Sequence, residues 1–257
     1  MTDVRPVVSI IIPTRDEAEC IEPLVGRLEE SLEGISAEVI FADDSSDHTP
    51  EIVEKVADTS ILPILCMHRS PGERTGGLGG AVVAALRLAK GETAVVMDGD
   101  LQHPPEYIPL MLSALKTEPV DMIVGSRYSD GGQANGLSNR TRRMVSNGVT
   151  DIARFIFPKR LRTLSDPMSG FFAFNVAAVE IDRLHPIGYK ILLEIVLRNR
   201  GMQVGEIGID FAPRFGGESK ATMREGMKFF IHIARLRLAT AARLRRNSGT
   251  LQVAHAG

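Results

Sequence analysis

Residues 95–106, VVMDGDLQHPPE, decide how this chain is best understood. An apolar stretch typical of a buried strand leads into two carboxylates, Asp98 and Asp100, and then into an amide, Gln102. Side chains at i, i+2 and i+4 project to one side of an extended backbone, so we expect these three to converge at the strand's carboxyl end. Three oxygen ligands suit Mg²⁺ or Mn²⁺. The competing interpretation is a strand end with two solvated acids and a turn at the prolines.

Similar apolar runs lie on both sides of this strand and alternate with helical patterns. The patterns predict strands at 7–12, 39–42, 61–67, 93–97 and 122–126, and helices at 17–32, 51–57, 79–89 and 105–115. This alternation predicts an α/β fold with a mostly parallel central sheet, flanked by helices and joined by right-handed crossovers. Ligands of such sheets bind beyond the carboxyl ends of the strands. Polar clusters follow four of the strands, at 15–17, 43–44, 98–102 and 126–127, so we expect one shared site there.

The second half of the chain is less regular. It predicts a helix at 141–157, a loop at 166–170 before a short apolar strand, a helix at 189–200 and a strand at 203–211. A glycine-containing loop at 214–221 and a long helix to about residue 246 follow, and 247–257 is predicted to be a disordered tail.

Composition limits the class of protein. The 257 residues are 44% hydrophobic with a net charge of -2, as in a globular protein with a sizeable core. Residues 14–58 hold 14 acidic and 3 basic residues, whereas 214–246 hold 9 basic and 2 acidic residues. This indicates an anionic partner for the basic end, either nucleic acid or a phosphate-bearing lipid surface. Cys20 and Cys66 have no disulfide or metal spacing, so we expect a reduced, cytoplasmic protein. The sequence has no secretory signal and no apolar run long enough to span a membrane, so any membrane contact is expected to be peripheral.

Seven short motifs follow one another along the chain: IIPTRDE at 11–17, DDSSD at 43–47, GLG at 77–79, DGDLQHPP at 98–105, GSRY at 125–128, SGF at 169–171 and GESK at 217–220. With these motifs in this order, the chain resembles a family 2 glycosyltransferase of the dolichol-phosphate mannosyltransferase type over roughly residues 7–245. The resemblance implies one GT-A-type, Rossmann-like domain over 1–246, with a nucleotide-sugar-binding half at 1–126, an acceptor half at 127–221 and a basic amphipathic helix at 222–246.

The resemblance implies residues that bind the donor. The residues implied to hold the nucleotide sugar are Pro13, Arg15, Glu17, Asp43, Asp44, Asp98, Arg214 and Lys220. A cation on Asp98, Asp100 and Gln102 would neutralise charge on the departing diphosphate. For Asp43 and Asp44 the alternative is a helix N-cap. Residues 76–80, GGLGG, could cradle phosphate, but we favour a flexible loop before a helix because the lysine of a P-loop is missing.

The resemblance also implies residues that bind the acceptor. Arg127, Arg142 and Ser146 match positions that cradle a lipid phosphate, and Arg142 and Ser146 lie at i and i+4 of a predicted helix. Without the resemblance, the arginines at 140–143 would be a solvated helix face. A phosphate is already an anionic nucleophile, so it needs positioning rather than a base. Asp166 lies where the wider superfamily keeps a catalytic base, and we expect it instead to shape the site.

The last predicted helix suggests a contact with a membrane. We expect Arg224, Lys228, His232, Arg235 and Arg246 to form one basic face, with the apolar residues elsewhere around the helix. Such a helix can lie among the headgroups of anionic lipids. The alternative is a helix that packs on the domain with a solvated basic face.

We therefore expect an inverting, metal-dependent enzyme that transfers a hexose to a polyprenyl or dolichyl phosphate. The expected hexose is mannose, and the expected donor is GDP-mannose. Asp100, Arg127 and Arg142 would be its catalytic residues. One alternative is a UDP-sugar donor or a soluble phosphorylated acceptor. A second is a non-catalytic nucleotide-sugar-binding module. Nucleic acid is not expected as a partner, because the basic helix lacks interleaved aromatic residues. A dinucleotide site is disfavoured because Pro13-Thr14-Arg15 stands where a glycine-rich turn is required.

Overall fold

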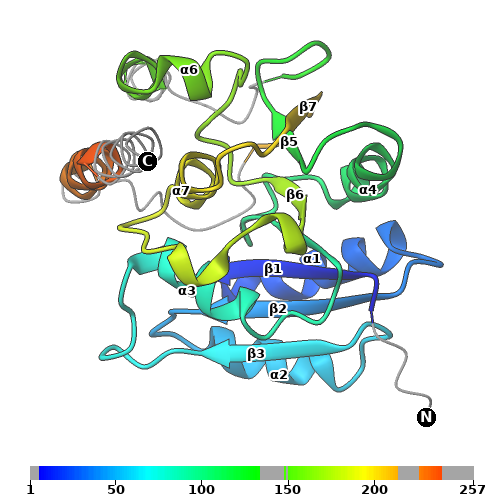
Figure 1. The fold of residues 1–257 in the computed structure, drawn as a ribbon. Helices are drawn as coiled ribbons and strands as arrows, with labels where there is room; N and C mark the ends of the chain where they lie inside the picture. The colour runs from blue at the N-terminus through cyan, green and yellow to red at the C-terminus, as the bar shows by residue number, and fades with distance from the viewer. Residues whose placement is uncertain (1–5, 134–147, 149, 214–225, 239–257) are drawn as a thin grey trace, which may run out of the picture.

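The computed structural model describes residues 6–133, 148, 150–213 and 226–238 (Figure 1). A seven-stranded sheet forms its centre, in the order β3-β2-β1-β4-β6-β5-β7. Strand β6 runs antiparallel to both of its neighbours, and the other pairs are parallel. The strands are β1 (Val8–Thr14), β2 (Ala37–Asp43), β3 (Ile64–His68), β4 (Thr93–Val96), β5 (Met122–Ser126), β6 (Phe172–Asn175) and β7 (Val204–Gly208).

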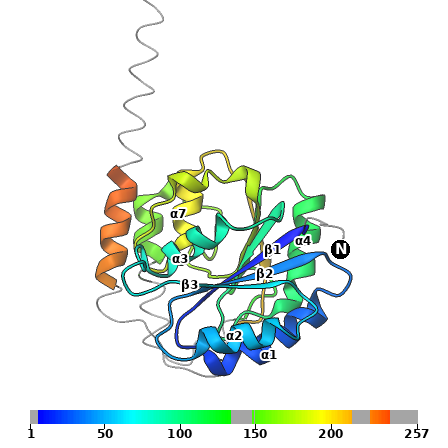
Figure 2. The same ribbon diagram turned by 90° about the horizontal axis from the view of Figure 1, so that it is seen from below.

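Helices cover both faces of the sheet (Figures 1 and 2). One face carries α1 (Ala18–Ser31), α2 (Thr49–Ala57) and α4 (Ile108–Thr117), which follows the 3-10 turn η1 (Pro105–Tyr107). The other face carries α3 (Gly77–Leu86), α6 (Pro158–Leu161), α7 (Ile191–Arg198) and helical segments at 150–156 and 226–238. Two further 3-10 turns are η2 (Val176–Ala178) and η3 (Ile181–Arg183).

Strand β1 shows why the chain folds this way. All seven of its residues are buried, because helices cover both faces of the sheet. Ile11 packs into the core beside α3 and α7, whereas Ile10 and Ile12 pack into the core beside α1 and α4. This alternation is the two-residue period of a strand. Fully burying an isoleucine side chain contributes about 1.5–3 kcal/mol, so the continuous apolar run is the main determinant of the strand.

The predicted fold class is confirmed, and the boundaries differ in places. The third strand begins at Ile64 rather than at residue 61, since the N–H groups of Ile61 and Leu62 are bound by side chains of Glu29 and Ser60 instead of a neighbouring strand. Helix α3 begins at Gly77, two residues earlier than expected. The predicted tail and the end of the last helix lie outside the described residues.

The antiparallel strand β6 determines which segments meet at the carboxyl edge of the sheet. The parallel strands end at this edge with their polar clusters. Because β6 runs the other way, its amino-terminal end lies at the same edge, and so does the loop at 166–170 that leads into it. The topology therefore adds this loop to the four clusters that the sequence had already suggested.

Candidate active site

The turn after β4 differs from the extended backbone that the sequence predicted. The strand ends at Val96, and the chain bends at 99–101, where Leu101 has a left-handed φ of 62°. Two backbone hydrogen bonds fix the turn: the Asp98 N–H donates to Nδ1 of His103 at 3.1 Å, and the Gln102 N–H donates to Oδ1 of Asp100 at 3.2 Å. The expectation that Asp98, Asp100 and Gln102 project from one side of an extended backbone is therefore wrong, because these residues lie in a turn.

The three predicted metal ligands have different surroundings. Asp100 and Gln102 are buried, whereas the side chain of Asp98 is 41% exposed. The amide Nε2 of Gln102 donates to the Ala212 carbonyl at 3.0 Å, so a ligand role for this side chain falls to Oε1. Two carboxylates and an amide oxygen on one turn fit a hard divalent cation by ligand type. Within the described ranges no group of three His, Cys, Asp or Glu side chains could hold a metal, so this mixed set stays a prediction.

Two glycines bring other segments against this turn. A Cβ on Gly170 would lie 2.7 Å from Oδ2 of Asp98, and one on Gly99 would lie 2.8 Å from Oε2 of Glu17. A side chain at either position would force the neighbouring carboxylate to move. The carboxylates of Glu17 and Asp98 therefore both lie against the backbone of this site, and their binding of the donor stays a prediction.

His103 is a buried, neutral part of the turn. Its ring stacks on Phe171 with centroids 5.4 Å apart and lies 5.3 Å from the ring of Phe211. Burial lowers the pKa of His103 to about 4, despite the attraction of the Asp100 carboxylate. At neutral pH the ring is uncharged, so the 3.6 Å between its Nδ1 and the Asp98 carboxylate is not an ion pair.

Arg127, predicted to hold the acceptor phosphate, forms a largely buried pair with Asp166. Its Nε and Nη2 lie 2.7 and 2.8 Å from the two carboxylate oxygens. Burial alone would lower the pKa of Arg127, but its hydrogen bonds to Asp166 offset this effect and raise the pKa above its ordinary value. The guanidinium also lies over the rings of Phe211 and Tyr128, at 5.3 and 5.5 Å. Asp166 thus orients Arg127, and its role in shaping a binding site stays a prediction.

Lys190 is a residue of this site that the sequence analysis missed. Its Nζ donates to the Met168 carbonyl at 3.0 Å and lies 4.5 Å from the centroid of the Tyr189 ring. Burial, and then the neighbouring charge of Arg127, lower its pKa to about 8. The signal in the sequence is a lone lysine directly before α7, whose seven residues from Ile191 to Leu197 are all buried.

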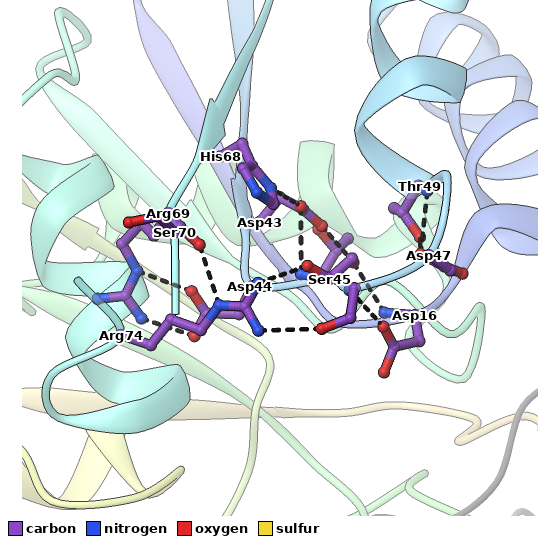
Figure 3. Close-up of polar contacts among 12 residues, drawn as sticks. Asp16, Asp43, Asp44, Ser45, Asp47, Thr49, His68, Arg69, Ser70 and Arg74 are labelled. Atoms are coloured by element: carbon purple, nitrogen blue, oxygen red, sulfur yellow. Dashed lines mark hydrogen bonds and ion pairs between the residues drawn. The ribbon is translucent and has the colours of Figure 1, made fainter. Parts of the chain in front are cut away.

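Asp43 and Asp44 lie in a hydrogen-bond network at the ends of β1, β2 and β3 (Figure 3). Asp43 accepts hydrogen bonds from the hydroxyls of Thr14 and Ser45, and lies 2.6 Å from Nδ1 of His68. Asp44 forms a buried bidentate pair with Arg69, at 2.8 and 2.7 Å. These two carboxylates therefore join three strands.

The N-cap alternative for Asp43 and Asp44 is wrong. Helix α2 begins at Thr49, and the carboxylate of Asp47 accepts its N–H at 3.0 Å and its hydroxyl at 2.6 Å. Binding of a nucleoside by Asp43 or Asp44 stays a prediction, and it would have to use oxygen lone pairs beyond those of the network.

Two of the predicted donor residues, Pro13 and Arg15, lie at the carboxyl end of β1, beside the end of β2. Pro13 is in the strand, in register with Ala42 of β2. Arg15 follows in an exposed turn, with its Nε 4.0 Å from a carboxylate oxygen of Asp16. Asp16 has a left-handed φ of 52° and accepts the N–H of Ser46 at 2.7 Å, which ties this turn to the end of β2.

The glycine run at 76–80 contacts another loop of the protein. Gly188 donates its N–H to the Gly76 carbonyl at 3.0 Å, and its own carbonyl accepts the N–H of Gly79 at 2.8 Å. A Cβ on Gly79 would lie 2.8 Å from Cβ of Pro186. The glycines are needed because the loop at 186–190 packs on them. The favoured interpretation, a flexible loop before a helix, is therefore wrong, because residues 77–80 form the first turn of α3 and the loop at 186–190 binds their backbone.

Four predicted site residues lie outside the described residues. These are Arg142 and Ser146, predicted to bind the acceptor phosphate, and Arg214 and Lys220, predicted to close over the phosphates.

The helix at 226–238 packs on the domain with a surface that differs from the predicted one. Phe229, Ile233 and Leu236 are buried. His232, expected on the basic face, is also buried: its Nε2 lies 2.9 Å from Oε2 of Glu194, and its Nδ1 accepts the N–H of Ile187 at 2.9 Å. The prediction of one basic face is therefore wrong for His232, which packs against α7.

The outer face of the same helix is apolar with basic residues beside it. Arg235 and Arg237 are exposed next to an apolar stripe. None of the described helices is both long enough and apolar enough to cross a membrane. The exposed stripe consists of Met227, Phe230, Ile231, Ala234 and Leu238.

Comparison with known proteins gives consistent matches. Residues 9–180 match the glycosyl transferase family 2. A dolichol-phosphate mannosyltransferase from Pyrococcus furiosus is 38% identical over 230 residues, which are 89% of this chain and 63% of that protein, so the chain spans less than two thirds of this relative. A dolichol-phosphate mannosyltransferase from Mycosarcoma maydis is 31% identical over 91% of this chain and 80% of its own length.

The fold also matches solved structures. The crystal structure of glucosyl-3-phosphoglycerate synthase from Mycobacterium tuberculosis, in complex with Mn²⁺, uridine diphosphate and glucosyl-3-phosphoglycerate, gives a TM-score of 0.64. The match covers 91% of this chain and 80% of that one, at 17% identity. At this identity the likeness concerns the fold alone, and it confirms the GT-A-type architecture.

Proposed function

This chain belongs to glycosyl transferase family 2, and on that basis we propose that it transfers a hexose from a nucleotide sugar to the phosphate of a polyprenyl phosphate. GDP-mannose is the proposed donor and mannose the transferred sugar, and the relatives named as dolichol-phosphate mannosyltransferases support this choice. In the reaction a phosphate oxygen forms a bond to the anomeric carbon while the bond from that carbon to the diphosphate breaks, which inverts the configuration.

The state of Asp166 is the observation that supports this acceptor best. A hydroxyl acceptor needs a general base, and Asp166 lies where the wider superfamily keeps one. Here both of its oxygens are bound by Arg127, at 2.7 and 2.8 Å, in a buried bidentate pair. A carboxylate held in this way is poorly placed to take a proton. A phosphate is already an anion, so a site that supplies cations in place of a base suits it.

The turn after β4 suits the donor. A divalent cation, Mg²⁺ or Mn²⁺, held by Asp98, Asp100 and Gln102 would neutralise the charge that develops on the departing nucleoside diphosphate. The half-exposed carboxylate of Asp98 faces the solvent side of the turn, whereas Asp100 is buried and fixed by the N–H of Gln102. The protein thus provides one accessible and one rigid carboxylate.

The helix at 226–238 would bring the enzyme to its lipid. Its inner face is fixed on α7, and its outer face presents the apolar stripe with Arg235 and Arg237 beside it. An apolar stripe flanked by basic residues favours the headgroup region of an anionic membrane. On this proposal the protein lies on the membrane surface and reaches the acceptor phosphate from there.

The test is an extraction assay with purified protein, Mg²⁺ or Mn²⁺, and a panel of labelled nucleotide sugars. One set receives polyprenyl phosphate and a second receives 3-phosphoglycerate as a soluble phosphorylated acceptor. Label that moves into the organic phase only with lipid and metal supports the proposal and identifies the donor. Label that enters a soluble product instead supports the alternative of a soluble acceptor. If folded protein neither transfers nor hydrolyses any donor, the non-catalytic binding module is favoured.

A further inference from the structure

One five-residue segment, 166–170, contacts three residues of the site: Arg127, Lys190 and Asp98. Asp166 pairs with Arg127, the Met168 carbonyl accepts from Lys190, and Gly170 contacts the carboxylate of Asp98. The segment leads directly into β6, which fixes its position in the sheet. Lys190 is therefore at the same site as the predicted metal turn, although it lies in a different part of the chain.

The position of Lys190 leaves a positive charge to be balanced. Within the described part of the chain its contacts are a neutral carbonyl and an aromatic ring, and no carboxylate lies within 4.0 Å of Nζ. Two acids lie farther away: Asp166 is already bound by Arg127, and Asp98 is a predicted ligand of the cation. A partly buried ammonium next to a guanidinium is costly unless an anion completes the site. The ammonium has three hydrogens, and the Met168 carbonyl uses one of them.

The loop that carries Lys190 is fixed from two sides. On one side Gly188 exchanges two hydrogen bonds with the backbone of Gly76 and Gly79. On the other side, the N–H of His185 donates to Glu194 at 2.9 Å and the N–H of Ile187 donates to His232 at 2.9 Å. Four backbone hydrogen bonds therefore hold this short loop. Such support is characteristic of a binding group that must be held at a defined position.

We propose that Lys190 is a phosphate-binding residue, whose ammonium donates to a non-bridging oxygen of a phosphate group bound between Asp98 and Arg127. This inference rests on the proposed function and adds a cation to it. The phosphate belongs either to the diphosphate of the donor or to the lipid acceptor, since both present the same oxygens. Lysine suits this role because its compact charge can meet either group.

The experiment measures binding by calorimetry in the whole protein, for wild type, Lys190→Met, Lys190→Arg and the control Lys116→Met. Lys116 is an exposed residue of α4 and makes a matched control. The probes are inorganic pyrophosphate with Mn²⁺, GDP with Mn²⁺, and farnesyl phosphate. Methionine replaces the ammonium by an apolar group of similar length, which is usually tolerated in a partly buried position. Thermal unfolding of each variant verifies that it folds.

We expect Lys190→Met to lose about ten-fold or more in affinity for at least one probe, the scale of a hydrogen bond to a charged group. Lys190→Arg should bind more tightly than Lys190→Met, and Lys116→Met should match wild type. A loss for GDP and pyrophosphate assigns Lys190 to the donor, and a loss for farnesyl phosphate assigns it to the acceptor. Unchanged affinity of folded Lys190→Met for all three probes overturns the inference.

The three probes also distinguish a failure of this inference from a failure of the proposed function. If wild type binds pyrophosphate through Lys190 but neither GDP nor farnesyl phosphate, the proposed function fails while the phosphate contact stands. If wild type binds GDP and farnesyl phosphate and Lys190→Met binds them equally well, the function stands and Lys190 has no part in binding. If wild type binds none of the probes, both are wrong.

Discussion

The guanidinium of Arg127 and the carboxylate of Asp166 face each other edge to edge, 39 residues apart in the chain, with Nε 2.7 Å from Oδ2 and Nη2 2.8 Å from Oδ1. The side chain of Asp166 is buried, and that of Arg127 is only 12% exposed. The pair joins the end of β5 to the loop before β6, so it ties the predicted acceptor half of the site together. A carboxylate whose two oxygens are both bound in this way is poorly placed to take a proton, and on the proposed function Asp166 is a positioning group.

Removing one partner of this pair should be costly. Asp166→Ala leaves a buried guanidinium without its counter-charge, and we expect the free energy of unfolding to fall by about 3–5 kcal/mol. Urea denaturation measures this change. Glu180→Ala is the matched control, because Glu180 forms a pair of the same length, 2.7 Å, with Arg183, but both side chains are about half exposed. Its loss should stay below about 1 kcal/mol. Equal losses in the two variants would contradict the assigned burial.

Asp100→Asn should remove turnover and leave the fold intact. Asparagine keeps an oxygen where Oδ1 accepts the Gln102 N–H, so the turn is preserved. It loses the charge that a divalent cation requires, and we expect at least about a 100-fold fall in transfer. Sugar transfer at fixed Mn²⁺, with unfolding temperature alongside, makes the measurement. Asp182→Asn, at an exposed position, is the control. Wild-type transfer by Asp100→Asn would refute the metal role.

Gly170→Ala should disturb Asp98 without unfolding the protein. The added Cβ would lie 2.7 Å from Oδ2, so the carboxylate must move. We expect the apparent Mn²⁺ requirement to rise and transfer to fall about ten-fold or more. Gly26→Ala in α1 is the control, since its Cβ would meet nothing within 4 Å, and alanine should stabilise that helix by about 0.5–1 kcal/mol. A Gly170→Ala variant with an unchanged metal requirement would argue against Asp98 as a ligand.

His103 should make the protein less stable in mild acid. Its pKa is about 6.5 in the unfolded chain and about 4 in the folded protein. Between these values the unfolded state takes up a proton that the folded state does not, so stability falls as the pH falls from 6.5 to 4. The expected loss is about 3 kcal/mol.

The variant His103→Asn tests this linkage, because Asn retains an acceptor near the position of Nδ1 and does not titrate. Other groups titrate equally in both proteins, so the difference between their unfolding free energies isolates His103. The free energy of unfolding of wild type should fall relative to that of His103→Asn as the pH falls from 6.5 to 4. A difference that is constant from pH 7 to pH 4 would mean that the folded protein protonates His103 readily.

The outer face of the helix at 226–238 should mediate binding to anionic vesicles. Phe230 and Ile231 are exposed on this face, and replacing either with Asp adds a charge that the headgroup region repels. We expect each variant to lose most of its sedimentation with vesicles that contain phosphatidylglycerol. Leu110→Asp changes an equally exposed apolar residue on α4 and should bind as wild type does. If all three variants bind alike, the stripe is not the lipid contact.

The strands and the location of the site could be predicted because both leave local signals. A strand buried on both faces, such as β1, is a continuous apolar run, and Asp98 directly follows another such run. The pairing of Asp43 with His68 could not be predicted, since these residues meet across strands and lie 25 positions apart. The left-handed Leu101 gives no signal either, because its side chain does not favour that backbone.

The contacts of two side chains, His232 and Lys190, could not be predicted from the sequence, for the same reason. Basic residues in a sequence are usually solvated, so the pattern predicts His232 on the basic face of its helix. In the structure its two ring nitrogens contact Glu194 and the N–H of Ile187. Lys190 precedes a buried helix and has no motif of its own. Only the tertiary contacts of such residues distinguish them from solvated ones.

The contacts of His232 mean that the helix at 226–238 cannot be treated as a detachable appendage. A chain cut before residue 226 would expose the core that Phe229 and Ile233 cover and would take away a partner of the buried carboxylate of Glu194. It would also free the Ile187 N–H, one of the anchors of the loop that carries Lys190. The part of the molecule proposed to touch lipid and the part proposed to hold phosphate are thus joined by direct contacts, and a shortened chain would disturb both.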